Sequence, residues 1–313
     1  MKPIPKVSII MATYNRSEYI LESIQSIQYQ TFKDWECIII DDGGTDNTQQ
    51  ILEPVLKQDS RFQYFMRTPN YQKGLPGSRN YGLDLAKGDY IIFFDDDDIA
   101  HPQNLELCVL ELSNNDISFC RYIRDIFRGD FIYNYDYSKE YTFFYIDSQD
   151  INKILRNELQ FNSCAVMWTK ECYSNHRYTE HLKYAEEWEV YARILTSVNR
   201  GISINKTLYY GRKHSVSITG DFGNKNLSSL ASYTDAIQLV IANLKNKKML
   251  SNEIIRYFIQ VSLEYKEYSL FGRIINTLDL PKYEELKWRL FYAHLPLRLY
   301  FYGIWKRVKN NIH

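Results

Sequence analysis

The 313-residue chain has no excess of charge of either sign, since it contains 38 Lys and Arg residues and 38 Asp and Glu residues. General nucleic-acid-binding proteins usually carry a basic excess, so this composition argues against that class. The chain also lacks any apolar run near the ~20 residues that a membrane-spanning helix needs. Its first apolar run, residues 7–12, is too short for the apolar core of a signal peptide. We therefore expect a cytoplasmic protein.

Cysteine and glycine patterns exclude further classes. The five cysteines are an odd number and none lies in a C-x-x-C pair, which argues against a disulfide framework and a zinc site. We expect reduced thiols at apolar positions. Gly74, Gly77 and Gly82 do not fit G-x-G-x-x-G, and no G-K-[ST] occurs. Any phosphate group should therefore be held by a metal ion and side chains.

The first half of the chain alternates strand and helix patterns. Short apolar runs predict strands at residues 7–11, 35–40, 62–66 and 90–94. Between them, apolar residues recur at helical spacing in three segments. The segments are residues 20–27, capped by Asn15 or Ser17; residues 51–56, capped by Thr45 or Asp46; and residues 76–86. This repetition predicts an α/β fold with a mainly parallel sheet flanked by helices.

The rest of the chain is less regular and then helical. We expect strands at 118–123 and 165–169, an aromatic-rich stretch at 131–145 and a helix at 185–198. Strand patterns vanish beyond about residue 220, and helices are expected at 227–244, 252–270 and 283–292. We therefore expect one domain at 1–220 and a C-terminal helical region at 221–313, with the boundary near Gly220.

Polar residues follow three of the predicted strands. They are Thr13, Tyr14 and Asn15 after the first, Asp41 and Asp42 after the second, and Asp95 to Asp98 after the fourth. Ligands bind outside the carboxyl ends of strands in an open parallel sheet, so these clusters should meet at one rim. Successive carboxylates repel one another, and a divalent cation would relieve that repulsion. The plainer alternatives are an Asx-capped turn at Asp41 and a solvated acidic loop in which Asp98 caps the next helix.

Seven segments, in order along the chain, together resemble glycosyltransferase family 2, whose members have the GT-A nucleotide-sugar-binding fold. They are VSIIMATYN (7–15), QTFKDWE (30–36), IDDGGTD (40–46), GSRNYG (77–82), AKGDYIIFFDDDD (86–98, followed by Pro102), AEEWE (185–189) and YYGRKHSVS (209–217). The resemblance covers roughly residues 5–220. It implies a GT-A domain followed by a C-terminal helical extension.

The resemblance implies a role for each matching residue. Ala12, Thr13 and Tyr14 would pass the base and ribose, Asp42 would accept a hydrogen bond from the base, and Arg79 would lie beside the nucleotide. Asp95 and Asp97 match the D-x-D motif, so Asp97 would bind Mn²⁺ or Mg²⁺, and Asp95 or Asp96 would contact ribose or metal-bound water. His214 would reach the metal or the diphosphate.

The catalytic base is implied to lie in the pair Glu186 and Glu187. The family usually has Asp at the second position, where this chain has the longer Glu187. Glu187 is the first expectation for the base and Glu186 the second. Three plainer alternatives stand beside these roles. The two glutamates are favoured by a helix dipole, Arg79 forms a surface ion pair with Asp84 or Asp89, and His214 is an ordinary loop histidine.

The resemblance implies a metal-dependent, inverting transfer of a sugar from a nucleotide sugar, most often a UDP-sugar. The acceptor would be a hydroxyl of a saccharide or of a lipid-linked molecule, in bacterial surface polysaccharide or glycolipid synthesis. One rival is a GT-A-like nucleotidyltransferase, which usually has a glycine-rich loop where this chain has Thr13 to Arg16. The other is a non-catalytic sugar- or nucleotide-binding module derived from a transferase.

Two aromatic-rich regions carry further hypotheses. Tyr133, Tyr135, Tyr137 and Tyr141 either offer ring faces to an acceptor sugar or form a half-buried hairpin edge. Residues 281–313 contain seven Lys and Arg against two Glu, interleaved with aromatics. Such a segment suits a helix on an anionic membrane, at the inner face of the cell membrane beside a lipid-linked acceptor. The alternative is packing on the catalytic domain or on a partner subunit of a homo-oligomer.

Overall fold

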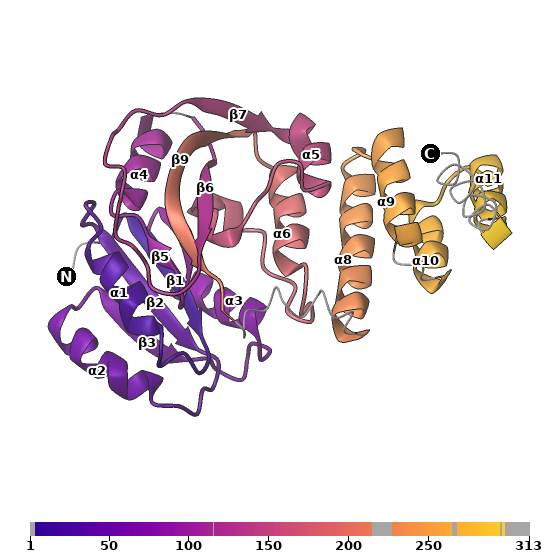
Figure 1. Ribbon diagram of the computed structural model, residues 1–313. Coiled ribbons are helices and arrows are strands. Elements are labelled where there is room, and N and C mark those ends of the chain that lie inside the picture. Colours follow the sequence, from indigo (N-terminus) through magenta and orange to yellow (C-terminus); the bar gives the residue numbers. More distant parts are fainter. Residues whose placement is uncertain (1–3, 115, 215–226, 265–267, 295, 298–313) are drawn as a thin grey trace, which may run out of the picture. The chain divides into compact units, whose positions relative to one another are not determined.

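The computed structural model describes residues 4–114, 116–214, 227–264, 268–294 and 296–297. The chain divides into two compact units, Met1–Asn243 and Leu244–His313. The boundary expected near Gly220 lies outside the described residues. In the first unit, helices flank a central sheet, and the second unit is helical where it is described (Figure 1).

Four parallel strands form the first half of the sheet. They are β1 (Val7–Thr13), β2 (Trp35–Asp41), β3 (Phe62–Met66) and β4 (Tyr90–Asp95), in the order β3-β2-β1-β4. The sequence predicts all four, because strands buried on both faces appear as continuous apolar runs. The crossover helices are α1 (Ile20–Gln28), α2 (Thr48–Gln58) and α3 (Leu75–Leu85).

The second half of the sheet is mixed. β8 (Val166–Thr169) pairs antiparallel with β4 and with β6 (Phe119–Phe127), and β6 runs parallel to β9 (Arg200–Arg212). Two shorter strands, β5 (Ile99–Ala100) and β7 (Phe143–Asp147), pair antiparallel with β9. The predicted strands at 118–123 and 165–169 are confirmed as β6 and β8. The sequence analysis missed β9, because Lys206 interrupts the alternation of its buried apolar residues.

The remaining helices agree with the sequence in part. In the first unit lie α4 (Asn104–Asn114), α5 (Ile151–Leu155) and α6 (Glu186–Leu195), together with the 3₁₀ turns η1 (Ser148–Asp150), η2 (Ser163–Ala165) and η3 (Lys170–Tyr173). Toward the C-terminus follow α8 (Leu227–Asn246), α9 (Asn252–Glu264), α10 (Tyr268–Leu278) and α11 (Lys282–Ala293). The single helix predicted at 252–270 is wrong, since α9 and α10 are separate. No helix among the described residues has the length and apolar character to cross a membrane.

The predicted caps are wrong for α1 and right in part for α2. Helix α1 begins after Tyr19 with no side-chain cap. Helix α2 begins after Asn47, and Oδ1 of Asp46 accepts the N–H of its first residue, Thr48, at 3.0 Å. Asn15 has a φ of 53°, and its Oδ1 accepts hydrogen bonds from the backbone N–H groups of Thr45 (2.7 Å) and Asp46 (3.2 Å). Asn15 therefore fastens the loop after β1 to the loop after β2, an interaction between distant segments that a local capping pattern does not contain.

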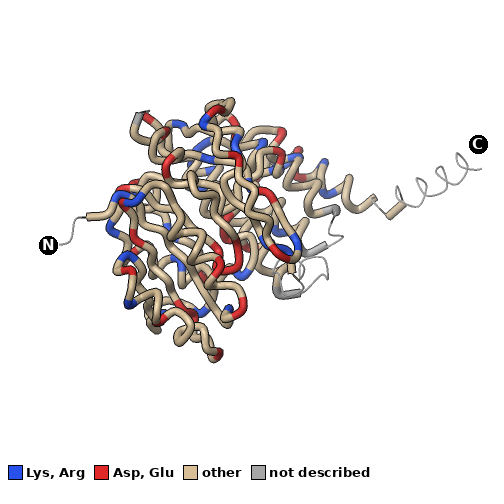
Figure 2. Tube along the Cα trace, turned by 60° about the vertical axis from the view of Figure 1, so that its left-hand side comes forward, with Lys and Arg blue, Asp and Glu red and all other residues tan. Residues whose placement is uncertain are grey.

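The core and the surface are as the composition suggested. All five cysteines are buried and none forms a disulfide, which confirms the expected reduced thiols. The core includes Ile9, Ile39 and Ile92 from neighbouring parallel strands. Apart from the four consecutive aspartates Asp95 to Asp98, acidic and basic residues are interspersed along the described trace (Figure 2).

Helix α3 packs closely on β1 through Gly82. A Cβ atom at this position would lie 2.4 Å from Cγ2 of Ile10. We expect Gly82→Ala to lower the free energy of unfolding by ~1–3 kcal/mol, because overpacking outweighs the better helix propensity of alanine. Urea unfolding followed by circular dichroism measures the change.

The matched control is Gly272→Ala in α10, where a new Cβ would meet nothing within 4 Å. Its stability should be unchanged or higher, by up to ~1 kcal/mol. Wild-type stability in Gly82→Ala would show that α3 and β1 pack less closely than described.

Candidate active site

The three polar clusters meet at one rim of the sheet, as predicted. Thr13 pairs with Asp41 across β1 and β2, and Ala12 pairs with Asp95 across β1 and β4. The carboxyl ends of these parallel strands therefore bring Thr13, Asp41 and Asp95 to one edge, where an open α/β sheet binds ligands.

The two aspartates after β2 differ in their contacts. Oδ1 of Asp41 accepts hydrogen bonds from the N–H groups of Gly43 (2.9 Å) and Gly44 (2.6 Å), so Asp41 shapes the turn. Oδ1 of Asp42 accepts from Nε of Arg67 at 2.5 Å and from the N–H of Gly74 at 3.1 Å. Only Asp41 thus fits the Asx-turn alternative, while Asp42 is held in a polar network.

Tyr14 is the exposed aromatic residue of the rim. Its side chain is 47% exposed, and Nζ of Lys73 lies 4.9 Å from its ring centre. Since nearly half of Tyr14 is exposed, part of the ring is accessible to a flat ligand such as a nucleotide base.

The acidic loop after β4 is surrounded by cations from distant segments. Arg79 Nη2 lies 3.5 Å from Asp95, Arg16 Nε lies 3.3 Å from Asp96, and Arg124 Nη2 lies 3.0 Å from Asp98. The backbone N–H of Arg212 also donates to Asp98 at 2.7 Å. The alternative of a solvated loop with Asp98 as a helix cap is therefore wrong.

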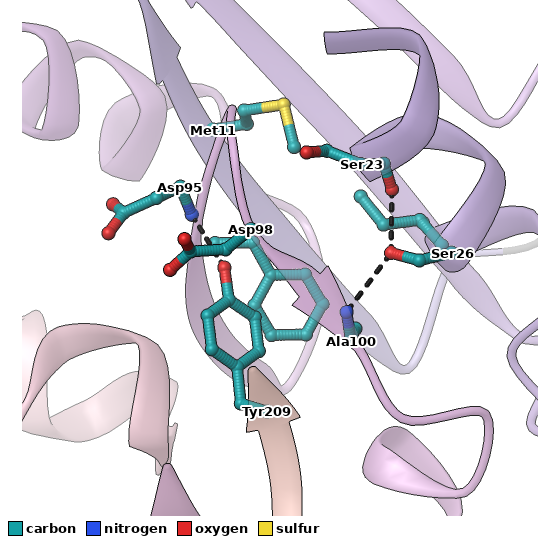
Figure 3. Close-up of a pocket in the computed structure, with 9 residues that line it drawn as sticks. Met11, Ser23, Ser26, Asp95, Asp98, Ala100 and Tyr209 are labelled. Carbon is teal, nitrogen blue, oxygen red and sulfur yellow. Dashed lines mark hydrogen bonds between the residues drawn. The ribbon is translucent and has the colours of Figure 1, made fainter. Parts of the chain in front are cut away.

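Burial and mutual repulsion act on the same loop. Burial, and then the charge of Asp97, raise the pKa of Asp96 to about 7. Burial, and then the charge of Asp95, raise the pKa of Asp98 to about 8. From below, the hydroxyl of Tyr209 accepts the N–H of Asp95 at 2.9 Å (Figure 3). The loop is thus a fixed, crowded set of carboxylates.

Asp97 and His214 are the residues that best fit a divalent cation. Nε2 of His214 lies 2.9 Å from Oδ2 of Asp97. Neighbouring ligands of an octahedral Mg²⁺ or Mn²⁺ lie about 2.9 Å apart, since the metal–ligand bonds are about 2.1 Å. A carboxylate and an imidazole both suit Mn²⁺, and the extra carboxylates of the loop would offset its charge.

A second group of potential ligands fits less well. Asp95, Asp98 and Cys164 have ligand atoms within 4.8 Å of one another. Asp98 is already neutralised by Arg124, and a buried thiol is a soft ligand that suits neither Mg²⁺ nor Mn²⁺.

Helix α6 places an acid pair opposite Arg79. Nη1 of Arg79 donates to Oε1 of Glu187 at 2.7 Å, and the N–H of Ser163 donates to Oε2 of Glu187 at 3.2 Å. Arg79 Nη2 also donates to Oγ of Ser163 at 2.9 Å. Arg79 is buried, so its expected surface pairing with Asp84 or Asp89 is wrong.

The environments of the two glutamates differ. Burial, and then the charge of Glu187, raise the pKa of Glu186 to about 7. Burial also disfavours ionisation of Glu187, but the charge of Arg79 and the hydrogen bonds from Ser163 and Arg79 bring its pKa below the ordinary value. A pair of carboxyl groups with pKa values driven apart is a common arrangement in acid–base catalysis.

The residues of this site that the sequence analysis missed include Arg16, Arg124 and Ser163. Arg16 follows the first polar cluster directly, so its position already offered a signal. Ser163 lies in the short turn η2, where no pattern distinguishes it. Ser215 and Ser217, in the segment around His214, lie outside the described residues.

This fold, with carboxylates at the ends of β2 and β4 and an acid pair on α6, is of the GT-A type. The sequence model of the family described as "Glycosyl transferase family 2" matches residues 8–171, just over half of the chain. The chain belongs to glycosyltransferase family 2.

Two curated relatives are similar over part of their length. The GalNAc(5)-diNAcBac-PP-undecaprenol beta-1,3-glucosyltransferase of Campylobacter jejuni is 44% identical over 94 residues, which are 30% of each chain. WfgD of Escherichia coli, a UDP-Glc:alpha-D-GlcNAc-diphosphoundecaprenol beta-1,3-glucosyltransferase, is 41% identical over 114 residues, 36% of this chain and 43% of WfgD. The matched segments span less than half of either relative.

A solved structure shares the fold over a larger part of the chain. S. aureus TarS 1–349 in complex with UDP-GlcNAc superimposes with a TM-score of 0.68 at 20% sequence identity, covering 87% of this chain and 79% of that chain. The likeness confirms the α/β fold of the GT-A type that the sequence predicted.

Proposed function

We propose that the chain transfers a sugar from a UDP-sugar to a hydroxyl of a saccharide or lipid-linked acceptor, in a metal-dependent reaction that inverts the anomeric centre. The supporting observation is the convergence of the acidic loop, Arg79 and the acid pair of α6 at one rim. Both relatives described above are named for glucosyl transfer to undecaprenol-linked saccharides, which favours this acceptor class.

The rim offers a place for each part of the donor. Ala12, Thr13 and Tyr14 would pass the base and ribose, with the exposed ring of Tyr14 against the base. Asp42 has one oxygen held by Arg67 and would use the other for a base N–H. Asp95 or Asp96 would contact the ribose or metal-bound water.

The diphosphate of the donor would bind on the side of the acidic loop where the divalent cation and Arg16 would lie. Asp97 and His214 would hold the divalent cation, which supplies charge neutralisation for the departing nucleoside diphosphate. Arg16 lies within 4 Å of both Asp96 and Asp97, and it would orient the phosphate oxygens. Arg79 would lie beside the sugar phosphate.

Glu187 is the proposed base. It is ionised at neutral pH, and Arg79 and Ser163 hold its two oxygens in a fixed orientation. As the acceptor oxygen attacks C1, the proton of the acceptor hydroxyl would pass to Glu187. Glu186 is the second candidate, favoured by a pKa close to neutral pH, where a general base is most effective.

Replacing each glutamate by glutamine separates these roles. Glu187→Gln is expected to reduce transfer by at least ~100-fold with nearly unchanged donor affinity, because the amide cannot accept a proton. Release of UDP measures transfer, and calorimetry measures donor binding. Glu186→Gln is the matched variant and should keep most of the activity.

The pH dependence of kcat is an independent test of whether Glu187 or Glu186 is the base. With Glu187 as base, kcat should stay flat through neutral pH, because its pKa is lowered. With Glu186 as base, kcat should rise as the pH passes about 7, since the deprotonated form is the active one. Full activity in Glu187→Gln would remove Glu187 from the role, and donor binding without turnover in the wild type would support the binding-module alternative.

The metal and the nucleotide can be tested together. With a nucleotide at ~100 times its Kd, mass action should raise the melting temperature by about 5 °C. We expect this shift with UDP, rather than with GDP, CDP or dTDP, and only when Mn²⁺ is present. Asp97→Asn should remove the Mn²⁺-dependent part. Asp130→Asn, at an exposed position, is the control, and an equal shift in both variants would reject Asp97 as a ligand.

We further propose that α11 contacts the inner face of the cell membrane, where a lipid-linked acceptor would lie. Tyr283, Leu286 and Leu290 recur at helical spacing on α11, and all three are more than half exposed. Lys282, Lys287 and Arg289 lie beside them. An exposed apolar stripe flanked by bases suits a helix in an anionic lipid interface.

Sedimentation with phosphatidylglycerol vesicles tests this contact. The double variant Leu286→Glu with Leu290→Glu should lose most of the vesicle-bound fraction, because it places charges in the apolar stripe. Leu110→Glu is the control, since Leu110 is a leucine on α4 that is also about half exposed. Equal binding of both proteins would contradict the proposal, and a wild-type dimer dissociated by the double variant would favour a second copy as the occupant.

A further inference from the structure

A groove of about 590 Å³ lies beside helix α1. Its walls include Gln25, Tyr29, Thr31, Tyr133, Tyr135 and Tyr137. We call it the tyrosine groove. It is formed between α1 and the segment 131–138, which has no regular secondary structure. Its volume lies within the usual range for small-molecule sites.

Buried polar side chains hold the segment 131–138 in place. Nζ of Lys206, a nearly fully buried residue, lies 2.6 Å from Oδ2 of Asp136 and donates to the backbone oxygen of Ser138 at 2.7 Å. His101 Nδ1 accepts the N–H of Gln103 at 3.0 Å, so its Nε2 donates to the backbone oxygen of Asp136 at 3.2 Å. The segment 131–138 forms no strand pairing, but the buried side chains of Lys206 and His101 hold it in place.

The tyrosine rings are ordered and yet exposed. The ring centres of Tyr135 and Tyr137 lie 4.9 Å and 5.6 Å from that of His101. Despite this packing, Tyr137 and Tyr133 are each 56% exposed, and Tyr29 on the facing helix is 70% exposed. Clustered exposed aromatic rings on a rigid support are typical of a ligand site, because the entropic cost of ordering them is already met.

The chemistry of the walls favours an uncharged sugar. None of the residues that line the groove, all of them described, carries a formal charge. A phosphate or nucleotide would therefore find no counter-charge. Ring faces cover the apolar face of a pyranose, while phenol hydroxyls and the Gln25 amide match sugar hydroxyls. An isoprenoid chain would favour aliphatic walls, and the groove has no Leu, Ile or Val among its lining residues.

The groove is connected to the acidic loop through α1. Glu22 lies one helical turn before Ser26, and it accepts hydrogen bonds from the hydroxyl of Tyr133 (2.6 Å) and from Nη2 of Arg212. Ser26 lines both the groove and the narrow space that Asp95 and Asp98 also line (Figure 3). One end of the groove therefore lies close to the proposed donor site.

We propose that the tyrosine groove binds uncharged sugar units of the acceptor, remote from the hydroxyl that reacts. This inference rests on the proposed transferase function and deepens it. The groove would select acceptors that carry several sugar units, because each ring stacked on a tyrosine adds affinity without contacting the reacting atoms.

Saturation-transfer NMR without donor or metal tests binding directly. The probes are maltotriose, cellotriose and triacetylchitotriose, with farnesyl phosphate as the isoprenoid probe. We expect at least one trisaccharide to bind the wild type. Tyr29→Ala and Tyr137→Ala should each weaken that binding about 3- to 10-fold. Tyr145→Ala is the matched control, since Tyr145 is an exposed tyrosine on β7 that does not line the groove, and it should bind as the wild type does.

A second variant covers the case in which Tyr137→Ala fails to fold. Gln25→Trp fills the groove from the exposed face of α1 and should abolish trisaccharide binding. The proposal is overturned if no trisaccharide binds, if the variants bind as well as the wild type, or if only farnesyl phosphate binds at the groove. A dimer of the wild type that dissociates in Tyr29→Ala would also overturn it, because the occupant would then be a second copy.

The two proposals fail in different ways. If the transferase function is wrong, UDP release stays absent while trisaccharide binding and its loss in the variants are still observed. If the groove proposal is wrong, UDP release with a short acceptor is intact while trisaccharide binding is absent or insensitive to the variants. With a multi-unit acceptor, Tyr29→Ala should raise KM about 3- to 10-fold and leave kcat unchanged.

Discussion

The crowding of four carboxylates at the end of β4 is the constraint on which the rest of the site depends. A buried acidic run is tolerated only if cations reach it, and the chain supplies them from segments far apart in sequence. Arg16 follows β1, Arg79 lies on α3 and Arg124 lies on β6. The same ion pairs that stabilise the loop therefore bring these elements together. The ion pairs of the site therefore link elements from several parts of the first unit.

The difference in pKa between Glu186 and Glu187 also follows from the placement of a buried arginine. Arg79 stands between the acidic loop and α6, and it contacts both Asp95 and Glu187. Because Arg79 pairs with Glu187, the neighbouring Glu186 is left to share a buried environment with an ionised carboxylate. One arginine thus gives two chemically identical side chains different proton affinities. A family pattern alone does not contain this distinction, since it depends on a residue more than a hundred positions away.

The elements that the sequence predicts well are those with local causes. Apolar runs revealed the parallel strands, and the order of polar clusters after them revealed the rim, because both follow from burial and strand direction. The cap predicted for α1 was wrong because Asn15 bonds to the loop after β2 instead of to its own helix. Strand β9 was missed because Lys206 looks like a surface residue until its partners Asp136 and Ser138 are known. The proposed roles of Asp97, His214 and Glu187 still rest on the family pattern and on geometry.

Strand β9 has one further consequence. It carries Lys206, which fixes the segment of the tyrosine groove, and six residues later Arg212, which fixes the acidic loop. An extended strand advances about 3.3 Å per residue, so the two anchors are separated by roughly 20 Å of stiff backbone. The distance between the tyrosine groove and the acidic loop is thus set by the backbone of β9, and side-chain motion does not change it. If the tyrosine groove binds the acceptor as proposed, this fixed spacing would select acceptors by length as well as by the identity of their terminal sugar.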